Sequence, residues 1–179
     1  NKELYEYVSS KSVSLPVPMI NIINGGKHAV NNIDIQEFMI VPVVKTMHER
    51  IRAGAEVFHE LKNLLVKNNF NVGVGDEGGF APNLENNAMA LEFIVEAIKK
   101  AGYKPGEDIF IALDVAASET YNKETKTYSI DGRNLTNKEL IEYYQELLRR
   151  YPILSIEDPF FEDDFDTLKE FTALVGDKI

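Results

Sequence analysis

The sequence predicts an α/β fold, most simply part of a (β/α) barrel. In the later half of the chain, short apolar runs alternate with stretches of helical periodicity, which is typical of parallel strands with helices outside. Acidic segments stand near the ends of three apolar runs, at 75–79, 113–114 and 155–159. Carboxylates at the ends of successive strands indicate one shared site. A doubly wound sheet would place its site at the same edge, and spacing alone does not separate the two folds.

The composition is that of a folded acidic protein. The 179 residues are 44% hydrophobic, which suffices for one domain with a real core. A net charge of −10 argues against nucleic-acid partners and favours hard cations such as Mg²⁺ at a site. The absence of cysteine excludes disulfides and thiolate metal sites and fits a reducing, cytoplasmic compartment. No apolar run approaches the roughly 20 residues needed to cross a bilayer, so we expect no membrane span.

The first half of the chain predicts a hairpin, a helix and a short strand. Residues 19–23 and 33–41 are strand-like runs joined by a long loop, and 71–75 is a short strand that ends in the acidic loop. A capping box at Thr46 begins a helix. The residues expected on its inner face are Ile51, Ala55, Phe58, Leu61 and Leu65.

The second half predicts alternating helices and strands. A helix opens at Pro82 and stops at Gly102, and 109–113 is a buried strand. An Asp-Gly hairpin turn lies at 131–132. The remaining elements are a helix that begins with a capping box at Thr136, a strand at 153–156, and a last helix marked by Leu168, Phe171 and Val175. About five strands of a barrel are present in total, fewer than a closed barrel needs, so we expect a barrel cut short.

Two interpretations compete for each candidate acid. Asp114 and Glu157 directly follow apolar strands, where a carboxylate either pairs with a basic side chain or helix end, or helps bind a divalent cation. Glu77 lies in the Gly-Asp-Glu-Gly-Gly segment at 75–79, which is either a tight acidic turn or a loop that presents a general acid near other carboxylates. His28 and the Gln36-Glu37 pair flank the loop after the first strand. A lone histidine there is a surface residue unless the loop folds over a site as a lid.

Five motifs, in this order and spacing, resemble the enolase family. They are NGGKHA at 24–29, IQEFMI at 35–40, GDEGGFAPN at 75–83, ALDVAASE at 112–119 and SIEDPF at 155–160. The resemblance covers nearly the whole chain, and the Asn-Asn-Ile-Asp stretch at 31–34 is similar to the bacterial form. It implies a glycolytic carbon–oxygen lyase that interconverts 2-phosphoglycerate and phosphoenolpyruvate with Mg²⁺ as cofactor.

The resemblance also implies roles for single residues. Asp114 and Glu157 match two of the three carboxylates that hold the first Mg²⁺, and Glu77 matches the acid that protonates the leaving 3-hydroxyl group. Gln36 and Glu37 match residues beside the substrate. His28 lies on the mobile loop that closes over it.

The family fold combines a small N-terminal α+β domain with a barrel whose first two strands form an antiparallel hairpin. Residues 1–15 are then the end of a segment leading into the barrel, and 16–179 its N-terminal part. The third metal carboxylate, the lysine base and the phosphate-binding arginine would lie beyond Ile179, so we expect this segment alone to be inactive. The resemblance further implies a homodimer or higher homo-oligomer in the cytoplasm, with a surface-associated pool as an option.

Two positions depart from the family pattern, and two other functions compete with enolase. Val30 stands in the lid loop where the family has a small or polar residue, and Thr120 replaces an aromatic residue. Another enzyme of the superfamily, such as an acid-sugar dehydratase or a racemase, would share the metal carboxylates but not the motifs at 36–37 and 75–79. An enolase-derived structural or surface-binding protein would keep every motif.

Overall fold

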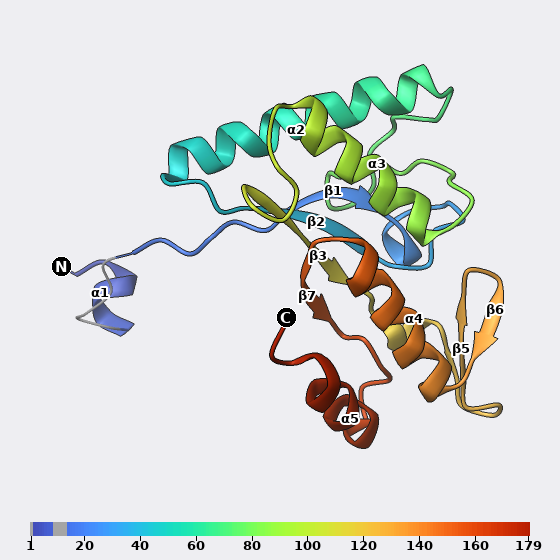
Figure 1. Ribbon diagram of the computed structural model, residues 1–179. Coiled ribbons are helices and arrows are strands. Elements are labelled where there is room, and N and C mark those ends of the chain that lie inside the picture. Colours follow the sequence, from blue (N-terminus) through green and yellow to red (C-terminus); the bar gives the residue numbers. More distant parts are fainter. Residues whose placement is uncertain (1, 9–13) are drawn as a thin grey trace.

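The structure, a computed structural model, describes residues 2–8 and 14–179 (Figure 1). Its centre is a sheet with the described strands in the order β1-β2-β3-β7. These are β1 (Ile20–Asn24), β2 (Glu37–Pro42), β3 (Ile109–Asp114) and β7 (Ile153–Glu157). Strand β2 runs antiparallel to β1 and β3, whereas β3 and β7 are parallel. The predicted hairpin and the predicted parallel pair are therefore confirmed.

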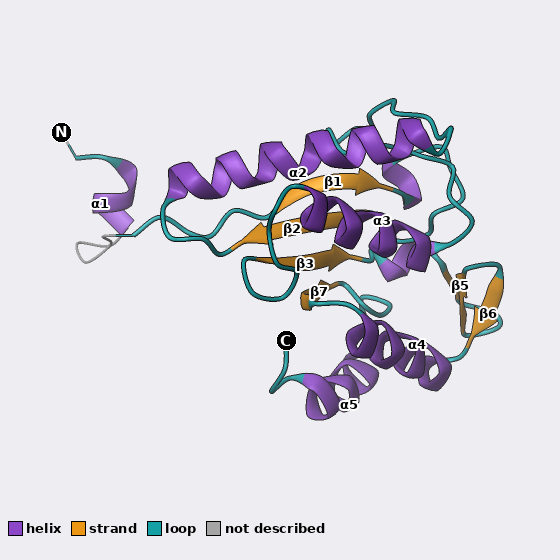
Figure 2. Cartoon of the chain, turned by 45° about the horizontal axis from the view of Figure 1, so that its top comes forward, coloured by secondary structure: helices purple, strands orange, loops and turns teal. Residues whose placement is uncertain are grey.

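The sheet is open, with β1 and β7 at its edges in the described part of the chain. Helices α2 (Met47–Lys67) and α3 (Asn87–Lys100) lie over β1 to β3, and α4 (Asn137–Arg150) and α5 (Phe165–Val175) lie beside β7 (Figures 1 and 2). Their apolar residues join one face of the sheet in a single core. Cover on one face fits a barrel better than a doubly wound sheet, which has helices on both faces. The predicted incomplete (β/α)₈ barrel is confirmed.

Residues on the two faces of the sheet belong to different clusters. Phe38 of β2 and Leu113 of β3 belong to the main core shared with the helices. Their neighbours Met39 and Ala112 form a small separate cluster on the opposite face. Because side chains alternate along a strand, Glu37 lies on the same helix-free face as Met39.

Capping boxes begin two helices, as predicted. The Thr46 side chain accepts a hydrogen bond from the Glu49 N–H at 3.2 Å, and Glu49 Oε2 accepts one from the Thr46 N–H at 3.0 Å. Thr136 and Glu139 form the same reciprocal pair at the start of α4. Each box satisfies backbone donors that the first turn of a helix leaves unpaired.

A second, smaller sheet contains β4 (Tyr121–Asn122), β5 (Thr127–Ile130) and β6 (Arg133–Leu135). The predicted Asp-Gly turn joins β5 to β6, with φ of 49° at Asp131 and 69° at Gly132. Positive φ at both central residues matches a type I′ turn, whose twist suits a hairpin.

The strand predicted for 71–75 is wrong. That segment holds a single bridge, from Val74 to Phe80. The Asn71 side chain accepts a hydrogen bond from the Gly73 N–H at 2.7 Å, and such local turns compete with strand pairing. The main sheet therefore has four described strands instead of about five.

Three further details differ from the prediction. β2 begins at Glu37 rather than 33, and α3 begins at Asn87, several residues after Pro82. In α2, Ile51 and Ala55 are exposed, because a close approach at Gly54 turns another face inward: a Cβ there would lie 2.4 Å from Ile20 Cδ1. The residues buried on α2 are Ala53, Gly54, Val57, Leu61, Leu64 and Leu65.

The short helix α1 (Leu4–Val8) lies apart from the sheet and has no buried residue (Figure 1). The segment 1–15, expected to lead into the barrel, falls partly outside the described residues, which omit 1 and 9–13. No helix in the described ranges is long and apolar enough to cross a membrane.

One buried asparagine ties three parts of the chain together. Asn87 is fully buried at the start of α3, and its Oδ1 accepts hydrogen bonds from the backbone of Asp34 and Ile35, each at 3.1 Å. Its Nδ2 donates to Asp131 in the β5–β6 turn at 2.9 Å. Asn87 therefore fixes the loop that leads into β2.

Replacing Asn87 with alanine should lower the free energy of unfolding by about 2 kcal/mol, because two backbone N–H groups lose their acceptor in a poorly hydrated site. Urea unfolding measures the change. The matched control is Asn134→Ala, at an exposed position of β6, which should stay within about 0.5 kcal/mol of wild type. Equal losses for the two variants would contradict the role given to Asn87.

Candidate active site at the strand ends

The strand register places four polar residues in one row. Asn24 of β1 pairs with Glu37 of β2, Glu37 with Asp114 of β3, and Asp114 with Glu157 of β7. Residues directly opposite on neighbouring strands point to the same face. Asn24, Asp114 and Glu157 end their strands, whereas Glu37 begins β2. Glu37 still lies at the same end of the sheet, because β2 runs antiparallel to the other three strands. The edge and face are those expected for a barrel site.

Asp114 is held by hydrogen bonds and not by a basic side chain. Its Oδ1 accepts from the Ala116 N–H at 3.1 Å, and its Oδ2 accepts from Gln36 Nε2 at 3.1 Å. In the described ranges, neither Asp114 nor Glu157 forms an ion pair with lysine or arginine. The interpretation that each carboxylate is neutralised by its own basic partner is therefore not supported.

Burial and neighbouring carboxylates raise the pKa values of Glu37 and Glu157. Partial burial raises the pKa of Glu37, the Asp114 carboxylate raises it further, and His28 opposes the rise. Lost hydration also raises the pKa of Glu157, with contributions from Asp114 and Asp158. Both shifts mean that the surroundings of Glu37 and Glu157 oppose the ionisation of these two side chains. A bound cation would relieve that repulsion.

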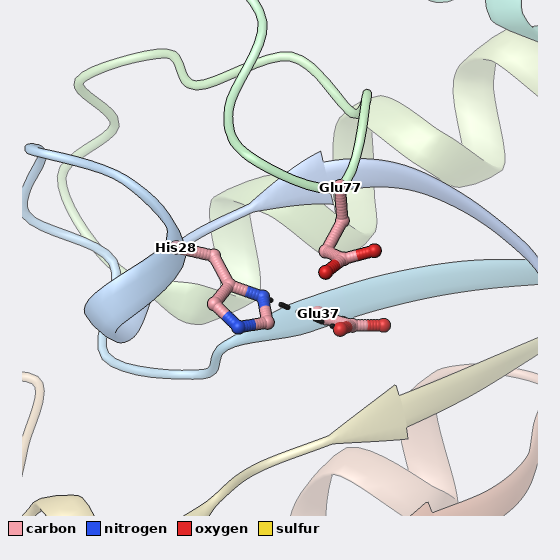
Figure 3. A group of neighbouring side chains, drawn as sticks. All are labelled: His28, Glu37 and Glu77. Carbon is pink, nitrogen blue, oxygen red and sulfur yellow. Dashed lines mark ion pairs between the residues drawn. The ribbon is translucent and has the colours of Figure 1, made fainter.

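His28, Glu37 and Glu77 converge on one point (Figure 3). Each offers a ligand atom, and these atoms lie within 4.8 Å of one another. His28 Nδ1 is 3.3 Å from Glu37 Oε1, close enough for an ion pair but without the alignment of a hydrogen bond. The Glu77 side chain points toward the other two from the loop that follows α2. The residues proposed as catalytic acid, substrate contact and lid are thus brought together.

Glycines let the Glu77 loop lie against β1 and the His28 segment. A Cβ at Gly75 would lie 2.7 Å from the His28 carbonyl oxygen, and one at Gly79 would lie 2.4 Å from Asn24 Oδ1. The loop is fixed by backbone hydrogen bonds from Asp76 N to the His28 oxygen, at 3.3 Å, and from Phe80 N to the oxygen of Ile22, at 2.9 Å. Positions 75 and 79 therefore require glycine, because a side chain at either position would collide with these neighbouring atoms.

An ion pair ties the His28 segment to the end of β3. His28 lies in the 3₁₀ turn η1 (Gly26–His28), and Lys27 in the same turn pairs with Glu119 in η2 (Ala117–Glu119). A recess of about 180 Å³ lies between these turns, with Gln36 in its lining. Both partners are largely exposed, so the pair positions the loop and adds little stability. Val30, on the same loop, is fully exposed.

Sequence reasoning missed Asn24, which falls in the loop expected after residue 23. The structure makes it the last residue of β1, fully buried, and its side-chain oxygen and nitrogen have no hydrogen-bond partner in the described ranges. Asn21, in the same strand, has the same unpartnered amide. The available signal was two asparagines three positions apart at the end of an otherwise apolar run. The side-chain amides of Asn21 and Asn24 are therefore free to form hydrogen bonds near the site.

The family follows from a comparison of this chain with models of known families. Residues 12–179 match the family described as "Enolase, C-terminal TIM barrel domain". The chain belongs to this enolase family. The match confirms the resemblance at the level of the family and indicates the lyase and dehydratase chemistry of the enolase superfamily.

The residues of this enolase-family domain suit a hard divalent cation. Asp114 and Glu157 are neighbours in register, supply only oxygen ligands and lack basic partners among the described residues. Mg²⁺ and similar ions prefer carboxylate oxygens. His28, Glu37 and Glu77 form a second group near enough to contact one small ligand.

Removing one carboxylate should stabilise the metal-free protein at neutral pH. The pKa of Glu157 is raised on folding, so its ionisation above that pKa opposes folding, whereas its neutral form at lower pH does not. Glu157→Gln should therefore raise the melting temperature at about pH 7 and change it little at about pH 4. Glu170→Gln, on the exposed side of α5, is the control and should show no such pH dependence. Scanning calorimetry in the presence of a chelator measures the melting temperatures. A melting temperature below that of wild type for Glu157→Gln at neutral pH would contradict the claim that ionised Glu157 opposes folding.

Proposed function

We propose that the full-length protein catalyses the Mg²⁺-dependent, reversible dehydration of 2-phosphoglycerate to phosphoenolpyruvate. The observation that carries this proposal is the row Glu37, Asp114 and Glu157, with Glu77 and His28 facing it across one edge of the sheet. The family match supports the same class of reaction. The motifs at 36–37 and 75–79 favour enolase over other members of the superfamily.

Asp114 and Glu157 would hold the cation. The proton removed from 2-phosphoglycerate lies beside a carboxylate, so its loss adds negative charge to a group that is already an anion. A divalent cation, when bound, supplies the positive charge that stabilises such an intermediate. The protein contributes two carboxylates fixed on neighbouring strands, one of them held by two hydrogen bonds.

Glu77 is the residue proposed to donate a proton to the leaving hydroxyl group. Its carboxylate lies beside that of Glu37, whose pKa is raised by burial and by the Asp114 carboxylate. His28, which is tethered through Lys27 to Glu119, would cover the substrate from the lid side. Closure of that loop would exclude water from the proton transfer.

A direct assay tests the proposal. The full-length protein should convert 2-phosphoglycerate to phosphoenolpyruvate, followed by ultraviolet absorbance, and lose that activity in chelator. Mg²⁺ should restore it. Activity on acid sugars or racemisation substrates in place of 2-phosphoglycerate would favour another superfamily enzyme. A folded full-length protein with no turnover would favour the structural or binding alternative.

Residues 1–179 alone should show no turnover and should bind Mg²⁺ weakly. The described sheet is open at both edges, and Glu77 and Glu157 are exposed. Isothermal titration and the same absorbance assay on the isolated segment provide the measurement. Turnover by this segment would contradict the proposed dependence on ligands from elsewhere in the protein.

Glu77→Gln in the full-length protein should lower kcat by about 10²–10⁴-fold, because an amide cannot donate the proton that a carboxylic acid supplies. The Mg²⁺ affinity should change much less. Glu85→Gln makes the same chemical change at an exposed position of the following loop and should keep wild-type kcat. Full activity in Glu77→Gln would remove Glu77 from the mechanism.

A further inference from the structure

Asp114 receives one hydrogen bond on each carboxylate oxygen, from two different parts of the chain. The Ala116 N–H reaches Oδ1, and the Gln36 side chain reaches Oδ2. Ala116, the second residue after the strand, adopts a left-handed conformation with φ of 47°. Two donors at fixed positions select one orientation of the carboxylate plane. Each oxygen keeps lone pairs for a further ligand.

Gln36 is itself fixed by the hairpin. It directly precedes β2, and its backbone oxygen accepts a hydrogen bond from the Gly25 N–H at 2.9 Å. Its side chain then crosses from β2 to β3. In the described ranges, the bond to Asp114 is the only hydrogen bond of the Gln36 amide. An ionised carboxylate only accepts hydrogen bonds, so the amide nitrogen must face Asp114.

We propose that Gln36 is a positioning residue for Asp114. This inference rests on the proposed function, in which Asp114 binds the cation, and it adds the support of a metal ligand to the substrate contact proposed for Gln36. Groups that orient a metal ligand affect affinity nearly as strongly as the ligand does, and their loss costs about 10–100-fold. The loss of Mg²⁺ affinity on replacement of Gln36 should therefore be measurable without substrate.

The test is Mg²⁺ titration of the full-length protein by calorimetry, without substrate. Gln36→Met keeps the length of the side chain but removes the donor, and Gln36→Asn keeps the amide but shortens its reach. Both should bind Mg²⁺ about 10–100-fold more weakly than wild type. Gln145→Met, at the chain's only other glutamine, on α4, is the matched control and should bind as wild type does. If Gln36→Met does not fold, Gln36→Asn carries the test.

A double-mutant cycle separates positioning from other roles. In an Asp114→Asn background, adding Gln36→Met should weaken Mg²⁺ binding no further, because the group that Gln36 orients has already been altered. Kinetically, saturating Mg²⁺ should restore most of the activity of Gln36→Met. A residue that contacts only substrate would instead raise the KM for 2-phosphoglycerate at every Mg²⁺ concentration.

The outcomes distinguish this inference from the proposed function. Unchanged Mg²⁺ affinity in both Gln36 variants of an active enzyme would overturn the positioning role and leave the function intact. Weakened binding in a protein that does not act on 2-phosphoglycerate would support the positioning role and overturn the function. A wild-type protein that binds no Mg²⁺ would overturn the positioning role as well, because Asp114 would then have no cation to hold.

Discussion

The candidate site depends on like charges held together by the register of a sheet. Backbone pairing across β2, β3 and β7 brings Glu37, Asp114 and Glu157 side by side on one face. Each of these carboxylates alone would be well hydrated, and together they repel. Burial raises the pKa values of Glu37 and Glu157, and the neighbouring Asp114 carboxylate raises both further. Strand pairing and the buried core stabilise the sheet. The fold can therefore keep these carboxylates together in an arrangement that favours a bound cation.

The surrounding contacts determine the geometry of this row. Asn87 holds the loop before β2, the glycines at 75–79 let Glu77 approach β1, and Lys27 ties the His28 turn to the end of β3. None of these contacts neutralises the row. They fix carboxylates in place and leave their charge available, which is the arrangement that preorganised catalysis requires.

Much of the fold could be predicted from local chemistry. The capping boxes at Thr46 and Thr136, the Asp-Gly turn and the apolar runs that form β1, β2, β3 and β7 were predicted, and the structure contains them. The predictions that failed concern segments whose structure depends on their neighbours in the folded chain. Asn71 turned an expected strand into a local hydrogen-bonded loop, and the approach of Ile20 to Gly54 rotated the buried face of α2. The acids could be picked out because they follow strands, but their alignment, the Gln36–Asp114 bond and the buried Asn24 depend on register across distant segments.

The most direct test is a crystal structure of the full-length protein soaked in Mn²⁺, an anomalous scatterer that substitutes for Mg²⁺. A single strong anomalous peak should lie about 2.1 Å from one carboxylate oxygen of Asp114 and one of Glu157, as hard-cation coordination requires. An ordered ion bound elsewhere, with both of these carboxylates bonded to lysine or arginine side chains, would contradict the account.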